Sequence, residues 1–225
     1  MRFFRLPGQA DPAPPHATGR SLDRGRRIGI VLRHTLYRNR IQGLGTVPET
    51  GPVVFVANHT NFIDGAVLFG LLPRRTSFLI KAEAVRGALG WILNHVGQYA
   101  INRTAPQRDL LLKAMDQLKR GGCIGVFPEG TRGAGLVESV FNGAGWLAVR
   151  TSAVVVPIAI RGTTRPAGSG RRFRPVVDVS IGESFAVQPG SGKKAVDAAT
   201  ALIQQRLSAQ VAELDRQLVG SRTSV

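Results

Sequence analysis

The stretch VVFVANHTNFIDGAVLFG, residues 53–70, contains a histidine and an aspartate whose spacing suits acid–base chemistry. His59 follows an apolar run typical of a buried strand, and Asp64 comes five residues later, where an apolar helical pattern begins. A carboxylate placed there can accept a hydrogen bond from Nδ1–H of the imidazole, which leaves Nε2 free to act as a general base. The alternative is a polar corner of the core, in which local caps satisfy the histidine.

A second group of reactive side chains, FPEGTR at residues 127–132, directly follows the buried-type run CIGV. Glu129 could accept hydrogen bonds from hydroxyl groups, Gly130 permits close backbone approach, and the Arg132 guanidinium could pair with a phosphate. This set of groups suits a phosphorylated polyol. An ordinary surface turn is the alternative, since Pro and Gly occur in turns generally.

Arg103, in the sequence INR, is a third candidate because it also comes after a predicted strand. Two guanidinium groups that converge on one dianion form a phosphate clamp. Arg103 and Arg132 would form such a clamp if the fold brings them together. A solvated arginine at the start of a loop is the alternative.

Short β-type runs alternate with helical patterns from residue 52 onward, and these elements must position the three groups. Strands are predicted at 52–58, 76–81, 98–102, 123–127, 153–160 and 174–182, and helices at 64–72, 82–96, 106–122 and 139–151. The pattern predicts one α/β domain with a central, largely parallel or mixed sheet flanked by helices. In such sheets reactive residues lie in loops at the carboxyl ends of strands, where all three candidate groups occur.

The chain divides into four segments. Residues 1–20, rich in Pro, Ala and Gly, are expected to form a flexible leader. Residues 21–45 are expected to form a basic amphipathic helix that contacts a membrane surface, docks on the domain, or does both. Residues 46–190 would form the domain, and residues 191–219 a C-terminal amphipathic helix that packs on it.

The charge of the chain narrows the classes of partner. Lys and Arg number 30 against 14 Asp and Glu, so the net charge is +16, which favours nucleic acid, anionic lipid or phosphorylated substrates. Only 6% of the residues are aromatic, and no basic stripe interleaves with aromatic residues, which argues against nucleic acid. The single cysteine, Cys123, excludes a disulfide framework and a multi-cysteine metal site.

The lengths of the apolar runs indicate whether the chain could span a membrane. No run approaches the ~18–20 apolar residues of a spanning helix, and no secretory signal pattern begins the chain. We therefore expect a peripheral protein on the cytoplasmic side of a membrane.

In order and spacing, NHTNFID, GQYAINR, FPEGTR and VVPIAI resemble the four sequence blocks of the 1-acylglycerol-3-phosphate acyltransferase family, the phospholipid/glycerol acyltransferases. The resemblance covers residues 45–185. It implies an enzyme that moves a fatty acyl group from acyl-CoA or acyl-carrier protein to the hydroxyl of a lysophospholipid. The implied acceptor is 1-acyl-sn-glycerol 3-phosphate and the product phosphatidic acid, with no cofactor and no metal.

The resemblance also implies residue roles. The family's His-x4-Asp motif is matched by His59 and Asp64, so His59 would be the general base and Asp64 the carboxylate that orients and stabilises the imidazolium. No covalent acyl-enzyme is implied, which leaves Cys123 as a core residue. The positions that hold the glycerol phosphate are matched by Arg103, Glu129, Gly130, Thr131 and Arg132. Phe78 and the helix at 82–96 are candidates for an acyl groove, with core packing as the alternative.

Several alternatives remain open at this point. The acceptor could be glycerol 3-phosphate or another lyso-lipid, and a hydrolase would use the same base to activate water. A basic lipid- or nucleic-acid-binding protein without catalysis would share the charge but would leave the His59–Asp64 pair without a role.

Overall fold

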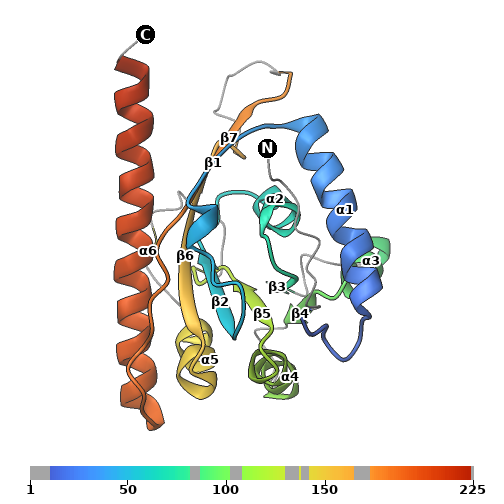
Figure 1. The fold of residues 1–225 in the computed structure, drawn as a ribbon, viewed down its shortest axis with the longest axis vertical. Coiled ribbons are helices and arrows are strands. Elements are labelled where there is room, and N and C mark those ends of the chain that lie inside the picture. Colours follow the sequence, from blue (N-terminus) through green and yellow to red (C-terminus); the bar gives the residue numbers. More distant parts are fainter. Residues whose placement is uncertain are drawn as a thin grey trace.

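The computed structural model describes residues 11–81, 87–101, 108–129, 137, 142–164 and 173–223. Its centre is a seven-stranded sheet with the order β1-β7-β6-β2-β5-β3-β4 (Figure 1). The strands are β1 (Arg38–Gln42), β2 (Val53–Ala57), β3 (Thr76–Lys81), β4 (Tyr99–Ile101), β5 (Cys123–Val126), β6 (Val154–Arg161) and β7 (Val176–Ile181). β6 and β7 pair antiparallel, whereas the other neighbouring strands pair parallel, as predicted for a mixed sheet.

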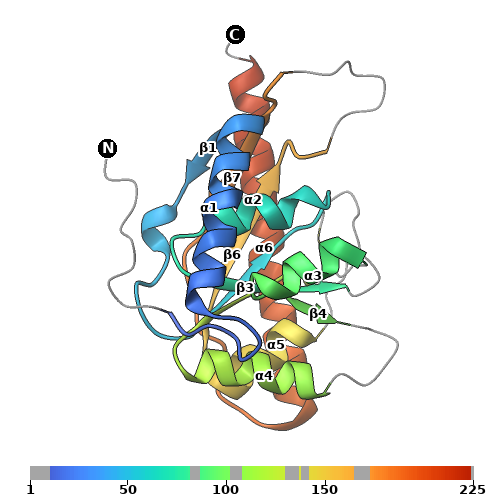
Figure 2. The same cartoon turned by 90° about the vertical axis from the view of Figure 1, so that its right-hand side faces the viewer.

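Helices cover both faces of the sheet. They are α1 (Gly19–Leu36), α2 (Ile63–Leu71), α3 (Gly87–His95), α4 (Arg108–Lys119), α5 (Gly143–Thr151) and α6 (Gly192–Thr223), and a short 3₁₀ helix, η1, spans Leu44–Thr46. In Figure 1, α1 and α2 lie on one side of the sheet and α5 and α6 on the other. Figure 2 shows α3 beside α1 and α2. In the described part of the chain, no helix is both long enough and apolar enough to cross a membrane.

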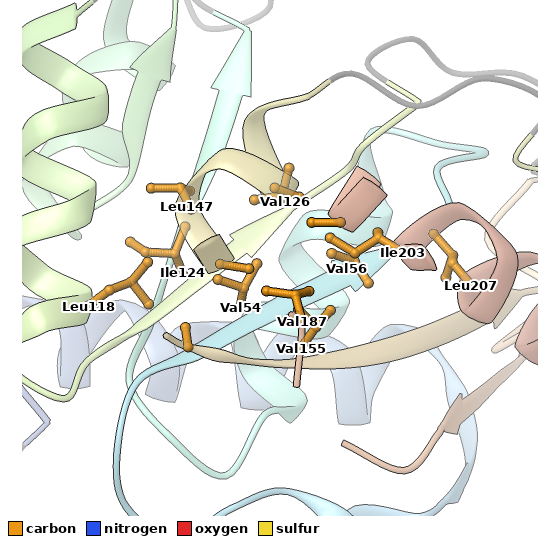
Figure 3. Packing of buried hydrophobic residues seen from close by; sticks show 14 of the residues in the cluster. Val54, Val56, Leu118, Ile124, Val126, Leu147, Val155, Val187, Ile203 and Leu207 are labelled. Carbon is orange, nitrogen blue, oxygen red and sulfur yellow. The ribbon is translucent and has the colours of Figure 1, made fainter. Parts of the chain in front are cut away.

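Strand β2 explains the two-sided core. All five of its residues are buried, and successive side chains of a strand point to opposite faces. Val54 and Val56 enter the cluster formed with α4, α5 and α6, which Figure 3 shows at close range. Val53, Phe55 and Ala57 enter the other cluster, with residues of α2. The continuous apolar run is therefore the pattern of a central parallel strand rather than of an edge strand.

The basic helix predicted for residues 21–45 is present but ends earlier. α1 stops at Leu36, and residues 38–42 form β1, which pairs parallel with β7. Exposure alternates along β1, with Asn39 and Ile41 partly buried, as expected of an edge strand. The extension of the helix beyond Leu36 was wrong because two arginines in RNRIQ look like the polar face of a helix.

Part of the predicted flexible leader contacts the domain. The Asp11 carboxylate bonds to the Arg74 guanidinium at 2.5 and 3.0 Å, and His16 Nε2 lies 3.1 Å from Gln98 O. Thr18 and Ser21 then form a capping box at the start of α1. Residues 11–20 are thus held in place, whereas residues 1–10 lie outside the described residues. The C-terminal helix packs on the sheet as predicted, through Ala199, Ile203, Leu207, Val211 and Leu214.

Candidate active site

The exit of β2 is fixed by a side chain that imitates backbone pairing. Asn58 is fully buried, and its amide donates from Nδ2 to Ile160 O at 3.1 Å and accepts from Ile160 N at 2.8 Å. These two bonds continue the pairing between β2 and β6 by one residue after β2 ends. The following residue, His59, therefore leaves the sheet from a rigid position.

His59 and Asp64 form the pair that their spacing predicts. The distance from His59 Nδ1 to Asp64 Oδ2 is 3.1 Å, and the Asp64 side chain is fully buried, whereas 17% of the His59 side chain is exposed. Asp64 lies in the first turn of α2, where the helix dipole favours a negative charge. Because a carboxylate accepts, the bond assigns the proton to Nδ1 and leaves Nε2 as the free acceptor.

The Asp64 carboxylate has further donors. The backbone N–H groups of Thr60 and Asn61 each donate to Oδ2 at 2.7 Å. The hydroxyl of Thr163 donates to Oδ1 at 2.5 Å. A buried carboxylate is stable when its oxygens are satisfied in this way. Thr163 was not predicted as a site residue, and its only signal in the sequence was a polar side chain just after a predicted strand.

The FPEGTR loop reaches the histidine through its first and third residues. The Phe127 ring stacks on the His59 ring with centroids 4.2 Å apart and an angle of 24° between the planes. Glu129 Oε1 accepts the His59 backbone N–H at 3.0 Å. Burial raises the pKa of Glu129 above its ordinary value, and the bond from the His59 N–H opposes that rise. β2 and β5 are parallel neighbours, with Val56 opposite Val126, which is why their exits meet.

The structure thus brings together three of the predicted site residues, His59, Asp64 and Glu129. The other four, Arg103, Gly130, Thr131 and Arg132, lie outside the described residues. Within those residues, no group of three or more His, Cys, Asp or Glu side chains is placed to hold a metal ion. Cys123 is fully buried in β5, and burial raises the pKa of its thiol to about 12, so the thiol is not an activated nucleophile.

An apolar pocket of about 460 Å³ lies beside the histidine. Its walls come from α1, α2, β3 and α3, and the His59 and Phe127 rings form part of the lining. Both predicted groove elements contribute, Phe78 from β3 and Leu89, Ile92 and Leu93 from α3. Four further residues line the pocket that were not predicted from the sequence, namely Gly25, Ile28, Gly29 and Leu32 of α1. This arrangement can hold a long apolar chain with one end at the base.

Known proteins resemble this chain in sequence. The family model described as "Acyltransferase" matches residues 38–161. The chain is 34% identical over 145 residues to the chloroplastic 1-acyl-sn-glycerol-3-phosphate acyltransferase LPAT1 of Arabidopsis thaliana, covering 60% of this chain and 40% of that protein. It is 30% identical over 181 residues to a 1-acyl-sn-glycerol-3-phosphate acyltransferase of Pseudomonas aeruginosa, covering 78% of this chain and 68% of that protein.

A solved structure shares the fold. The crystal structure of the 1-acyl-sn-glycerophosphate (LPA) acyltransferase PlsC from Thermotoga maritima superposes with a TM-score of 0.67. The two chains are 23% identical, and the match covers 86% of this chain and 79% of that one. The α/β architecture is therefore shared despite low sequence identity.

Proposed function

Because the chain belongs to the acyltransferase family, we propose that it transfers a fatty acyl group from a thioester donor to the hydroxyl of a lysophospholipid. The proposed acceptor is 1-acyl-sn-glycerol 3-phosphate and the product phosphatidic acid, in keeping with the names of the two relatives. The observation that carries the proposal is the His59–Asp64 pair beside the apolar pocket. The donor would be acyl-CoA or acyl-carrier protein.

His59 is the general base of the proposed reaction. Its free Nε2 takes the proton of the acceptor hydroxyl while the hydroxyl oxygen attacks the thioester carbonyl carbon. The C–S bond then breaks, and the imidazolium returns the proton to the leaving thiolate, so the products are an ester and a thiol. Asp64 keeps the imidazole oriented and stabilises the imidazolium while it exists.

The FPEGTR loop would serve both the base and the acceptor. Glu129 already accepts the His59 N–H, so it positions the backbone of the base. Arg103 and Arg132 are proposed to bind the acceptor phosphate, because paired guanidinium groups recognise a dianion well. Gly130 would let the backbone approach the bound acceptor, and Thr131 would add a hydroxyl to the loop.

The apolar pocket is the proposed site of the acyl chain. Leu32, Phe78 and Leu89 face it from three elements, and each CH₂ group buried there would contribute about 0.8 kcal/mol to binding. A chain seated in the pocket would have its carbonyl end near the His59 ring, where the base acts.

The proposed substrates are lipids, and the surface beside the pocket suits a bilayer. Exposed apolar side chains lie on α1 and α3, among them Ile28, Val31, Leu36, Trp91 and Ile92. Exposed arginines occur on α1 at positions 20, 24 and 27, and on the adjoining strand β1 at positions 38 and 40. We propose that this face rests on an anionic bilayer, where each arginine contributes about 1 kcal/mol.

An acyl-transfer assay tests the proposed function. Wild-type protein is supplied with long-chain acyl-CoA, with and without 1-acyl-sn-glycerol 3-phosphate, and free thiol is measured. Thiol release should require the acceptor and fall by a factor of about 10²–10⁴ in His59→Ala. His34→Ala, which removes an exposed histidine of α1, should retain activity.

Two outcomes would contradict the proposal. Thiol release without any acceptor would identify a hydrolase. Full activity in His59→Ala would exclude His59 as the base. If folded wild-type protein is inactive with this pair, repeating the assay with acyl-carrier protein or other lyso-lipids decides whether the substrates or the activity were assigned wrongly.

A further inference from the structure

Thr163 stands just after β6 and touches the site from a distant part of the sequence. Its hydroxyl oxygen is 2.5 Å from Asp64 Oδ1, and the two residues are 99 positions apart in the chain. Both are buried, Thr163 at 9% exposure and Asp64 at 0%. The contact therefore forms only in the folded domain.

The donors to Asp64 are divided unevenly between its two oxygens. Oδ2 accepts from His59 Nδ1 and from the N–H groups of Thr60 and Asn61, and the Thr60 hydroxyl lies 3.4 Å from it. Within the described part of the chain, Thr163 is the donor to Oδ1. Without it the carboxylate would be held through one oxygen, and rotation about its Cβ–Cγ bond would be less restricted. That rotation moves Oδ2 relative to His59 Nδ1.

The Asp64 carboxylate, which can only accept, favours one direction for the Thr163 hydroxyl. A threonine hydroxyl has one proton to donate, and Thr163 gives it to Asp64. Thr60 Oγ1 lies 3.1 Å from Thr163 Oγ1 and 3.4 Å from Asp64 Oδ2, so its one proton can go to either oxygen. Asn61 Nδ2 donates to Thr163 O at 3.3 Å. The loop after β6 is thus tied to the turn that carries the base.

We propose that Thr163 is a positioning residue, which holds the Asp64 carboxylate at the angle that keeps the His59 imidazole in its Nδ1–H form. This inference rests on the proposed function insofar as His59 acts as the base. Thr163 acts through Asp64 and does not bind the acceptor. Its removal should therefore lower kcat and leave the KM of the acceptor nearly unchanged.

Three variants test the proposal in the full chain. Thr163→Val keeps the shape but removes the hydroxyl, and should lower kcat about 10- to 100-fold, as expected for loss of a hydrogen bond to a charged group. Thr163→Ser restores the hydroxyl and should recover most of the rate. Thr200→Val is the matched control, because Thr200 is also buried and its hydroxyl has no partner in the described structure. It should leave kcat unchanged.

A second measurement does not depend on activity. The ring nitrogens of ¹⁵N-labelled histidine report the tautomer by NMR, and the His59 signal is identified by its loss in His59→Ala. Wild type, Thr163→Ser and Thr200→Val should show the Nδ1–H form, whereas Thr163→Val should show a mixture of tautomers. If Thr163→Val does not fold, Thr163→Ala carries the same test.

The outcomes separate the two proposals. Wild-type kcat and an unchanged tautomer in folded Thr163→Val would overturn the role of Thr163 while leaving the proposed function intact. A folded wild type that stays inactive with every acyl donor and lyso-lipid tested would refute the proposed function, and the tautomer measurement would still decide the role of Thr163. Equal changes in kcat and KM, without rescue by serine, would indicate general damage to the site and would also overturn the inference.

Discussion

Two carboxylates near His59 have different surroundings. Asp64 is fully buried and is bonded through both oxygens. Glu129 is partly exposed and accepts the backbone N–H of the histidine. Burial raises the pKa of Glu129 from its ordinary value of 4.5. Asp64 orients the imidazole ring, whereas Glu129 holds the backbone that carries it.

The raised pKa of Glu129 makes stability depend on pH. The folded protein keeps the Glu129 proton at pH values where the unfolded chain has released it, so the free energy of unfolding falls as the pH rises from about 4.5 through the folded-state pKa. Glu129→Gln keeps an oxygen for the His59 N–H and has no proton to release. Urea unfolding from pH 3.5 to 7.5 should therefore show the variant gaining stability relative to wild type as the pH rises.

Asp215 provides a control of opposite sign. Its pKa is lowered by the hydrogen bonds from Arg161, at 2.7 and 2.9 Å. The stability that this pair provides is present above the ordinary aspartate pKa and is lost as the pH falls through the folded-state value. Asp215→Asn should thus become less stable relative to wild type as the pH rises. Parallel trends in the two variants would contradict the assignment for Glu129.

The residues of the site differ in how far the sequence could reveal them. The His59–Asp64 pair was predicted because five positions across one turn already bring the groups together. Thr163 could not be predicted, because its contact depends on β6 lying beside β2. Glu129 was predicted at the site as an acceptor for substrate hydroxyls, and the bond to the His59 N–H became visible only in the structure. Contacts within one turn could be predicted from local spacing, whereas contacts across the sheet could not.

The contact of α1 with α2 is made by glycine. Gly29 of α1 lies against Gly70 of α2, and a Cβ added at Gly70 would be 2.6 Å from the Gly29 carbonyl carbon. Small residues on both helices allow their backbones to come this close. The contact sets the position of α1 over the apolar pocket, because Gly25, Gly29 and Leu32 line it.

Alanine substitutions at a packed glycine and at an exposed one should separate the effect of helix packing on stability from the effect of helix propensity. Gly70→Ala should lower the free energy of unfolding by about 1–3 kcal/mol, because the backbones must move apart. Gly220→Ala, in α6, meets no atom within 4 Å and should raise it by up to about 1 kcal/mol. Thermal or urea unfolding measures both. Stabilisation by Gly70→Ala would show that the two helices do not pack at this glycine pair.

Most elements followed from the periodicity of the sequence, and the exception has a physical cause. Strands such as β3 and β5 are short apolar runs between turns, and they appear where they were predicted. β1 was missed because an edge strand exposes alternate residues, and arginine suits that exposed side as well as it suits a helix surface. Its pairing with β7, more than 130 positions later, cannot be read from local pattern.

At the scale of the molecule, α1 carries exposed arginines as well as exposed apolar side chains, and α3 adds further exposed apolar side chains. We expect the protein to float with vesicles that contain anionic lipid at low salt and to be released as salt rises, because surface charges are screened. Val31→Asn should weaken binding about tenfold or more, since burial of a valine contributes about 1.5–3 kcal/mol. Val31 is 59% exposed on α1 and lies outside the pocket lining.

A matched substitution on another helix tests whether vesicle binding depends on this face or only on the hydrophobicity of the whole surface. Val219 is 66% exposed on α6, on the opposite side of the sheet from α1 (Figure 1). Val219→Asn should bind vesicles as well as wild type does. Equal weakening by both variants, or no flotation of the wild type at low salt, would refute the proposed membrane face.

The long-range bonds at the exit of β2 also affect how the protein is made. Asn58 pairs with Ile160, 102 positions later, and Asp64 with Thr163, 99 positions later. At about 5–20 residues per second, ribosomes need about 5–20 s to add that stretch. During this interval β2, whose residues are all buried in the finished sheet, lacks its partner β6. Even after β5 has been made, the nascent chain thus carries an apolar strand with one unpaired edge that invites aggregation, and the speed of translation sets how long a chaperone must cover that edge.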